Sequence, residues 1–321
     1  DAGGATESFH GVRPGELMLA AGSGGQVPSP EGRPAVQSGL REPSAIAFDG
    51  YGRLFIGHRI DGGRWAIGFV DDRGLLYRAI SGLDGVVHAL TWSAPRNALI
   101  AVVGNRILRI DCLEDLTAPS RLNCTSSPFA GGGLDDHLDE GDPATSVTFP
   151  VRTSGSWRRP AVGGLWASPT SDDVYLTVPA TELVWKIDRG GALRRVAGTG
   201  VRNPHASPLH GDGGPALSAN LNGPGPITGD SAGNIYFADH ERPDIVHEGQ
   251  VVFGNVAVRR IDAATGLLST VVGTNMFGWT GDDYPAAGNP SFPVISLAVS
   301  PPRPGAPDGE LHFGVHGYVT A

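Results

Sequence analysis

Four of the ten histidines in this sequence lie where a repeated strand pattern begins or ends a strand. Neutral imidazoles bind Zn, Cu, Ni or Fe, and several rings around one ion with an open position form a catalytic metal centre. Histidines in a polar channel also serve as ordinary hydrogen-bonding groups, and this alternative stays open. The candidate metal ligands are His58, His88, His240 and His316.

One of these histidines is out of step with two of the others. His240 and His316 occupy the same position of the repeat, whereas His58 is offset from it by one residue. Successive residues of a strand point to opposite faces of the sheet. The ring of His58 could therefore be turned away from an opening that the other histidines share.

Three polar side chains follow these histidines closely and are the candidate catalytic residues: Arg59, Glu241 and Tyr318. A carboxylate beside a metal-bound histidine can act as a general base or orient the ring. Arginine and tyrosine could steer a substrate. The expected cofactor is a Zn or Cu ion. No organic cofactor is expected, because the sequence contains no GxGxxG or P-loop motif.

A polar insertion over residues 240–255, HERPDIVHEGQVVFGN, replaces what is normally a short connection between strands. A long insertion of this kind is a candidate lid or recognition loop, and a solvated surface loop is the competing interpretation. Tryptophans in predicted loops could stack on a ligand. The candidate ligand-binding residues are Trp65, Asp61, Asp244, His247 and Trp279.

An acidic run, LDDHLDEGD, covers residues 134–142. Carboxylate oxygens are the ligands that Ca²⁺ prefers, so a structural Ca²⁺ is one interpretation of this run. The run lacks the spacing of an EF-hand and stands in the ordinary lead-in to a repeat. A solvated loop is therefore the favoured interpretation.

Short β-strands that recur along the chain must position all of these residues. A Pro-Ala pair followed by a bulky apolar residue precedes most copies, and turns such as Asp230-Ser-Ala-Gly233 separate the strands. Four short strands joined by tight turns form a meander that cannot bury both of its faces alone. The expected inner strands cover residues 45–48, 88–92, 164–167, 226–229 and 296–299.

Stacking such meanders around an axis gives a β-propeller. We expect an all-β fold of four-stranded blades, five in number, with six as the alternative. An N-terminal strand over residues 17–22 is expected to complete the last blade, which would remove the exposed sheet edges. In a propeller the start of each inner strand and the end of each second strand meet at one rim, and the candidate residues gather there.

Composition supports this class and excludes others. The 321 residues include 48 Gly and 26 Pro, which suits many strands and turns. The net charge of −9 argues against a nucleic-acid partner. No apolar run is long enough to span a bilayer. A single lysine, Lys186, stands among many arginines, and we interpret this as a compositional bias rather than a site.

The only two cysteines, Cys112 and Cys124, lie twelve residues apart. In the repeat they end one strand and begin the next, so a disulfide would link a hairpin. Two buried free thiols are the alternative. A bridged pair indicates an oxidising compartment, and the chain opens at Asp1 without a signal peptide, as a mature exported protein would. We expect a secreted or periplasmic location.

The stretch from residue 211 to residue 273, with GDGGPA, LNGPGPI, GNIYFADH and VRRIDAATGLLSTVVG, resembles the bacterial NHL-type repeat. The similarity extends to residues 33–57 and 192–200 and is weaker in the second and fifth copies. It implies one NHL-like propeller domain over residues 1–321, with a flexible segment at 1–12. More distantly, the chain is similar to amidating-lyase and teneurin-type NHL propellers.

The amidating lyases hold zinc with histidines at the start of inner strands. The corresponding positions here are Ser44, His88, Gly163, Gly225 and Ile295. Only His88 matches, so neither that zinc triad nor that reaction is carried over. The Glu, Asn and Asp that gluconolactonase-like hydrolases place in these positions are missing as well.

Two functions remain from different classes. The first is an exported binding module that presents a histidine-lined site at the channel mouth to a protein, glycan or small-molecule ligand. The second is a metal-dependent lyase or hydrolase that uses the same histidines. The sequence slightly favours the binding module.

Overall fold

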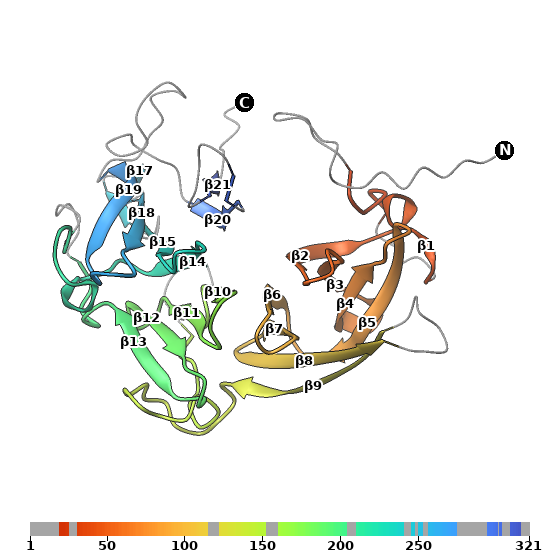
Figure 1. Cartoon of the computed structure of the whole chain (residues 1–321), viewed down its shortest axis with the longest axis horizontal. Coiled ribbons are helices and arrows are strands. Elements are labelled where there is room, and N and C mark those ends of the chain that lie inside the picture. Colours follow the sequence, from red (N-terminus) through yellow and green to blue (C-terminus); the bar gives the residue numbers. More distant parts are fainter. Residues whose placement is uncertain are drawn as a thin grey trace. The chain divides into compact units, whose positions relative to one another are not determined.

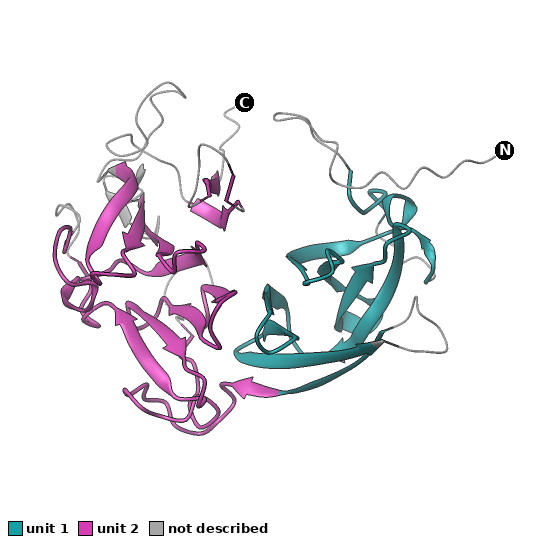
Figure 2. Ribbon diagram, viewed as in Figure 1, with its two compact units in different colours: residues 1–127 teal, residues 128–321 magenta. Residues whose placement is uncertain are grey.

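The computed structural model describes residues 19–25, 31–114, 122–151, 160–203, 210–240, 245–247, 250–252, 256–274, 294–300, 302–303 and 309–315. The chain divides into two compact units, Asp1–Ser127 and Pro128–Ala321 (Figure 2). Each unit is described by itself. The single domain over residues 1–321 therefore remains a prediction.

The first unit contains a five-stranded antiparallel sheet in which four consecutive strands form a meander. Its order is β1(Arg33–Pro34), β5(Leu75–Leu83), β4(Trp65–Val70), β3(Leu54–Arg59) and β2(Arg41–Phe48). A second meander follows, with the strands β6(Val87–Ser93), β7(Ala98–Val103), β8(Arg106–Glu114) and β9(Leu122–Ala130) (Figure 1). The last residues of β9 belong to the second unit (Figure 2).

The second unit contains two further four-stranded meanders, which lie side by side (Figure 1). The first is β10(Gly164–Ala167), β11(Val174–Val178), β12(Leu183–Ile187) and β13(Leu193–Ala197). The second is β14(Pro224–Gly229), β15(Ile235–His240), β18(Val256–Ile261) and β19(Leu268–Thr274). Two hairpins complete this unit: β16(Ile245–His247) with β17(Gln250–Val252), and β20(Val294–Val299) with β21(Leu311–Val315).

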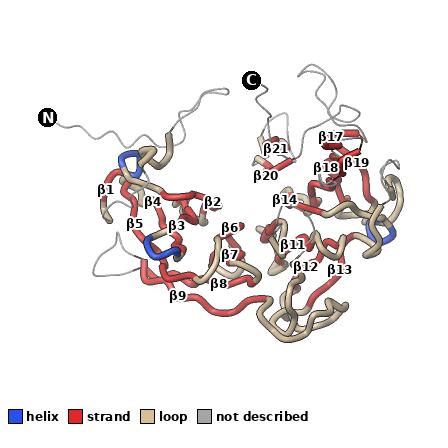
Figure 3. The backbone as a smooth tube through the Cα atoms, turned by 180° about the vertical axis from the view of Figure 1, so that it is seen from behind, coloured by secondary structure: helices blue, strands red, loops and turns tan. Residues whose placement is uncertain are grey.

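Helical structure in the described residues is limited to single 3₁₀ turns (Figure 3). They are η2(Ala35–Gln37), η3(Asp61–Gly63) and η4(Ala216–Ser218). None of the helices found in the described part of the chain could cross a membrane. The prediction of an all-β chain built from propeller-type blades is therefore confirmed, and all five expected inner strands are present, as parts of β2, β6, β10, β14 and β20.

The blade number is corrected. The described residues form four complete blades, where the sequence predicts five or six, and the fifth copy of the repeat is present as the two-stranded sheet β20–β21. The described part of the expected N-terminal strand, residues 19–22, is not in a strand. Ala20 and Ala21 pack instead on the small apolar cluster around Ala35, Leu54 and Ile56.

The Pro-Ala pairs have a structural role that recurs from blade to blade. Before β14, the Ala216 N–H donates to the Gly266 carbonyl of its own blade (3.0 Å). The Ala216 carbonyl accepts a hydrogen bond from the Gly198 N–H at the end of β13 (3.0 Å). Ala216 is buried at 2% exposure in the core of this unit. The backbone of one residue thus joins two consecutive blades.

The Pro-Ala segments at two other positions make the same pair of backbone hydrogen bonds. They are formed by Ala144 with Gly191 and Gly131, and by Ala35 with Gly74 and Gly22. The prolines before these alanines pair with the outer strand or hairpin of the same blade: Pro34 with Leu75, Pro143 with Ala192 and Pro215 with Leu267. Gly22 therefore occupies the position that ends an outer strand in the other copies. This confirms the repeat through backbone geometry.

Aspartates fix the hairpin turns that the sequence indicates. The Asp230 carboxylate accepts hydrogen bonds from the Asn234 N–H (2.8 Å) and side chain (2.7 Å). The Asp262 carboxylate accepts from the Thr265 N–H (3.0 Å) and hydroxyl (2.9 Å). Such side-chain acceptors satisfy the backbone of a tight turn and stabilise it.

Each unit has its own apolar core. In the first unit Phe55, Phe69 and Tyr77 stack with ring centroids 5.8 and 5.7 Å apart. Cys112 and Cys124 pack against this cluster and form the expected disulfide between β8 and β9. In the second unit the core gathers residues of β13, β14, β15, β18 and β19, with Phe237 fully buried.

Candidate functional site at the strand bulges

We define the rim end of a blade as the end where its inner strand begins and its second strand ends. At this end four inner strands carry a β-bulge, between Arg41 and Ala45, Val87 and Ala89, Pro224 and Ile227, and Val294 and Ser296. A bulge re-aims the side chain it contains and is frequent beside binding sites. The bulged residues include four positions singled out in the sequence: Ser44, His88, Gly225 and Ile295.

A charged group lies at the rim end of the first blade. Arg59, the last residue of β3, donates from Nη1 to Glu42 Oε1 at 2.8 Å. Arg41 Nε lies 3.9 Å from the same oxygen. The Glu42 backbone has φ 46°, a left-handed conformation that costs free energy for a residue with a side chain. The bulge thus holds Glu42 between two guanidinium groups, both partly exposed.

His88 occupies the bulge at the start of the second blade. Its neighbour Val87 accepts a hydrogen bond from the Ser44 hydroxyl at 2.6 Å, which ties the two inner strands together. The His88 residue is exposed, yet partial desolvation by the surrounding protein lowers its pKa from 6.5. At neutral pH its ring is therefore neutral and can accept a hydrogen bond or bind a metal.

His58 has a different environment, as its offset in the repeat indicates. It lies on the face of β3 that carries Leu54 and Ile56, and its ring lies against Gly68 of β4. His58 is 6% exposed, and its Nδ1 is 3.3 Å from the Arg59 carbonyl. Burial lowers the pKa of His58, with a smaller contribution from the Arg78 charge and an opposing one from the Arg59 carbonyl. The ring serves as an internal packing and hydrogen-bonding group.

Asp61 and Trp65 lie just beyond the end of β3. Asp61 is exposed in the 3₁₀ turn η3, where a ligand can reach it. The sequence predicts Trp65 in a loop. In the structure Trp65 instead begins β4, opposite Arg59. Its side chain is 6% exposed in the core cluster of the first unit. It can therefore stack on a ligand only after the core rearranges.

The other predicted site residues lie mostly outside the described part of the chain. His240 ends β15 and pairs with Val256, and His247 pairs with Gln250 in the β16–β17 hairpin of the insertion. For both, the backbone alone is described. Outside the described residues are Glu241, Asp244, Trp279, His316 and Tyr318. Their roles remain predictions.

At the rim end of the fourth blade the structure places a buried ionic network that the sequence motifs did not indicate. Arg259 donates from Nη1 to Asp239 Oδ2 at 3.1 Å and from Nη2 to Asp212 Oδ1 at 2.7 Å. Asp239 also accepts from the Asn222 N–H at 2.6 Å. Burial raises the pKa of the Asp239 carboxyl, while the Arg259 charge and the hydrogen bonds oppose this rise. Asp239 occupies the position that His58 has in the first blade.

A second buried carboxylate lies nearby. Glu182, in the turn between β11 and β12, has φ 58° and accepts a hydrogen bond from the Gly223 N–H. Arg202 Nε lies 3.8 Å from its other oxygen. The Asn222 side chain is 1% exposed, and its amide atoms have no hydrogen-bond partner among the described residues. This part of the rim end is polar but closed.

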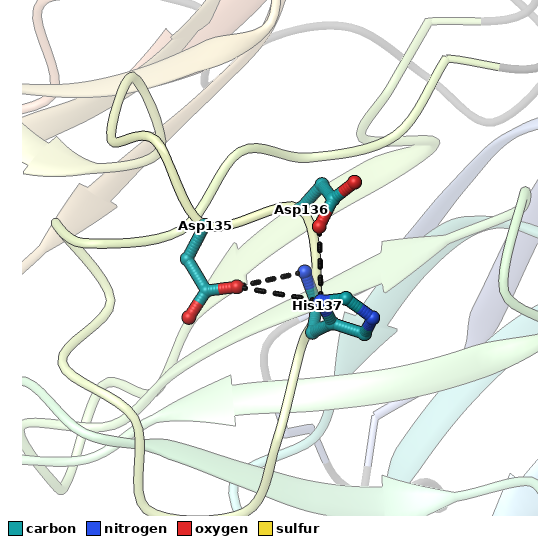
Figure 4. A group of neighbouring side chains, drawn as sticks. All are labelled: Asp135, Asp136 and His137. Atoms are coloured by element: carbon teal, nitrogen blue, oxygen red, sulfur yellow. Dashed lines mark hydrogen bonds and ion pairs between the residues drawn. The ribbon is translucent and has the colours of Figure 1, made fainter.

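The acidic run forms an exposed cluster in the second unit (Figure 4). His137 Nδ1 lies 2.9 Å from Asp136 Oδ1 and 3.6 Å from Asp135 Oδ1. Asp135, Asp136 and His137 are the only three potential metal ligands whose donor atoms gather within 4.8 Å in the described part of the chain. The side chains of Asp136 and His137 are 86% and 80% exposed, as expected for a solvated loop. The described residues do not bring His58 and His88 together with a third ligand.

Comparison with protein-family models gives no match. No curated protein matches either. Among solved structures, a streptogramin B lyase is 14% identical, with 85% of this chain and 62% of that chain covered and a TM-score of 0.42. An auxiliary nutrient binding protein from Bacteroides ovatus is 15% identical (84% and 67% covered, TM-score 0.40), and one from Bacteroides thetaiotaomicron is 19% identical (59% and 43%, TM-score 0.41).

The chain spans less than two thirds of the length of the lyase and of the Bacteroides thetaiotaomicron protein. Similarity at this level does not transfer a ligand or a reaction to this chain.

Proposed function

We propose that this chain is an extracytoplasmic binding module that recognises a polar ligand at the rim ends of its propeller-type blades. The observation that carries the proposal is the repeated bulge. The same backbone device presents Glu42 and Ser44 in the first blade and His88 in the second, both in the first unit. A fixed scaffold with different side chains at one equivalent position is the usual arrangement of a recognition surface.

The first unit supplies the polar contacts for such a ligand. The side chains of Arg59 and Glu42 are 35% and 49% exposed. An exposed ion pair of this kind contributes little to stability. A ligand carboxylate can therefore replace Glu42 as the partner of Arg59 at small cost, through a charge-assisted hydrogen bond. His88 and Asp61 add a neutral ring and a carboxylate, and a carboxylate-bearing glycan is the ligand class that suits this set.

The extracytoplasmic location rests on the disulfide between Cys112 and Cys124. Such bridges form and persist in secreted and periplasmic proteins and are rare in the reducing cytosol. The same location gives access to glycans and to proteins outside the cell. The partner proposed first is a glycan, with proteins and other small molecules as alternatives.

A second candidate function, a Zn- or Cu-dependent lyase or hydrolase, is favoured by His88. This ring is exposed on a bulge and is neutral at neutral pH, as a metal ligand must be. In this proposal His240 and His316 join it, Arg59, Glu241 and Tyr318 assist, and His58 would have to leave its place beside Gly68. A structural Ca²⁺ at Asp135 and Asp136 is a separate proposal, which Ca²⁺ titration tests.

Calorimetric titration separates the binding module from the enzyme. Trigalacturonate serves as the acidic glycan probe and maltotriose as its neutral control. We expect saturable binding of trigalacturonate and a metal content well below one ion per chain by elemental analysis. Failure of both sugars to bind, together with stoichiometric Zn or Cu that disappears in His88→Ala, would favour the enzyme instead.

A further inference from the structure

The sequence contains a single Asn-Gly pair, Asn222-Gly223, and the structure places it where the third and fourth blades meet. The Gly223 N–H of the fourth blade donates to Glu182, which lies in the turn between β11 and β12 of the third blade. Beside this contact the Thr177 hydroxyl of the third blade donates to the Gly225 carbonyl at 2.7 Å. The pair is therefore part of the contact between two blades of the second unit.

An Asn-Gly pair can react with itself. The Gly223 nitrogen attacks Asn222 Cγ, the new C–N bond closes a five-membered succinimide ring, and Nδ2 leaves as ammonia with the proton of the Gly223 N–H. Water then opens the ring and gives aspartate or isoaspartate. Glycine favours the attack because it has no Cβ beside the reacting nitrogen. Water is the only other reactant.

Two carboxylates hold the backbone on both sides of the torsion that controls this attack. The Asn222 N–H donates to Asp239 Oδ1 at 2.6 Å, and the Gly223 N–H donates to Glu182 Oε2. These two nitrogens are the ends of the ψ torsion of Asn222, about which the Gly223 nitrogen turns relative to Cγ. The Asp239 and Glu182 side chains are 2% and 4% exposed, and hydrogen bonds to ionised acceptors are strong. The torsion is therefore fixed while the two blades stay together.

The surroundings of the Asn222 side chain also disfavour the reaction. The residue is 1% exposed, and neither Oδ1 nor Nδ2 has a hydrogen-bond partner among the described residues. Ring closure places negative charge on Oδ1, which a hydrogen-bond donor must stabilise. Water supplies that donor only when the blades separate locally, as native proteins do at a small equilibrium population.

We infer that Asn222 is a deamidation site that the contact between the third and fourth blades keeps unreactive. Local separation breaks the bond between Glu182 and Gly223, frees the ψ torsion and admits water to the amide. The product carries a carboxylate in a region that already holds Glu182 and Asp239, while Arg259 is already shared by Asp239 and Asp212. A further buried negative charge is costly, so the modified chain closes less readily and the change is irreversible.

Mass spectrometry of proteolytic peptides tests this inference, because conversion of Asn222 replaces an amide with a carboxyl group. The wild type is incubated at mildly alkaline pH in native buffer and in denaturing urea. We expect conversion of Asn222 to be at least about tenfold slower in native buffer. Asn220 is the internal reference. Leu221 follows it and hinders ring closure, so Asn220 is expected to convert slowly under both conditions.

Substitutions of Glu182 test its role in the protection. Glu182→Gly removes the acceptor of the Gly223 N–H and suits the left-handed backbone there, with φ 58°. We expect it to raise the rate in native buffer at least about fivefold. Glu140→Gly is the matched control, because the exposed Glu140 carboxylate also accepts a backbone N–H, that of Arg195 on β13 (3.1 Å). Glu182→Gln keeps an acceptor oxygen and is expected to retain most of the protection.

Three results would overturn the inference. They are a wild type that converts Asn222 equally fast in native buffer and in urea, equal rates in Glu182→Gly and Glu140→Gly, and an unchanged urea midpoint in Asn222→Asp. The last variant reproduces the aspartate product, and we expect its urea midpoint to be lower than that of the wild type. None of these measurements involves a ligand, so the inference and the proposed function can fail independently.

Discussion

Arg259 and Asp239 form an ion pair across β18 and β15, 3.1 Å from Nη1 to Oδ2, with side chains that are 0% and 2% exposed. The pair joins the strands on either side of the polar insertion. Arg259 Nη2 also donates hydrogen bonds to the segment that precedes β14, at the His210 carbonyl (2.9 Å) and at Asp212 Oδ1 (2.7 Å). One guanidinium thus connects three segments of the fourth blade.

Removing this guanidinium is expected to destabilise the fourth blade strongly. Arg259→Met leaves the Asp239 carboxylate buried without its partner, which typically costs about 3–5 kcal/mol. Arg260→Gln is the control, since Arg260 forms a partly exposed pair with Asp262 and such a pair contributes about 0–1 kcal/mol. Urea denaturation followed by circular dichroism measures both. Equal losses in the two variants would contradict the role of the pair.

The hydrogen bond from the Gly198 N–H to the Ala216 carbonyl connects the third and fourth blades, and it predicts the effect of a substitution at Gly198. Gly198 has φ +95°, and a Cβ there would collide with the Glu182 carbonyl and lie 3.2 Å from Leu221 Cδ1. We expect Gly198→Ala to cost about 3 kcal/mol or more.

Gly191 is the matched control, because it also has positive φ but has open space around a Cβ. Gly191→Ala should cost about 1 kcal/mol. Thermal unfolding of the two variants compares them. A Gly198→Ala variant as stable as Gly191→Ala would show that the blades are not joined as described.

His58 predicts a pH dependence of stability. Burial lowers its pKa below the ordinary value of 6.5, so the unfolded chain binds a proton there more readily than the folded one. The contribution is fully present above pH 6.5 and is lost as the pH falls through the folded-state pKa. We expect the wild type to lose more unfolding free energy than His58→Gln between about pH 7.5 and 5. Equal losses of unfolding free energy in the wild type and in His58→Gln over this pH range would contradict the prediction.

The disulfide predicts a stability difference between oxidised and reduced protein. Cys112 and Cys124 are twelve residues apart and close a short loop, for which loop entropy gives about 3 kcal/mol. The double variant Cys112→Ser/Cys124→Ser should unfold at correspondingly lower urea concentration. Reductant should lower the midpoint of the wild type alone. A wild type that is insensitive to reductant would contradict the predicted contribution.

The strands and turns were predictable because their signals are local. An aspartate followed three or four residues later by glycine, between short apolar runs, indicates a hairpin wherever it occurs, as at Asp230 and Asp262. The disulfide was predictable from two cysteines that flank one hairpin. The prediction that an N-terminal strand over residues 17–22 completes the last blade was not confirmed, since the described residues 19–22 are not in a strand. Such a strand would need partners from the other end of the chain.

The site was less predictable because it depends on side-chain direction and on partners far apart in sequence. The offset of His58 indicated a different direction for its ring, and the structure shows this ring buried against Gly68 of β4. Asp239 and Arg259 are separated by the insertion, so no short motif reveals their pairing. No short motif reveals that Lys186 pairs with Asp173 beside the Tyr175 ring, because both contacts depend on the pairing of β11 with β12.

Calorimetric titration of trigalacturonate into the wild type, Arg59→Gln and Arg73→Gln tests the proposed binding at the rim end most directly. Arg73 pairs with Asp71 at the opposite end of the same blade, so it is the matched control. We predict saturable binding that weakens at least about fivefold in Arg59→Gln and stays unchanged in Arg73→Gln. Absence of saturable binding by the wild type, or equal affinities in all three proteins, would contradict the proposed function.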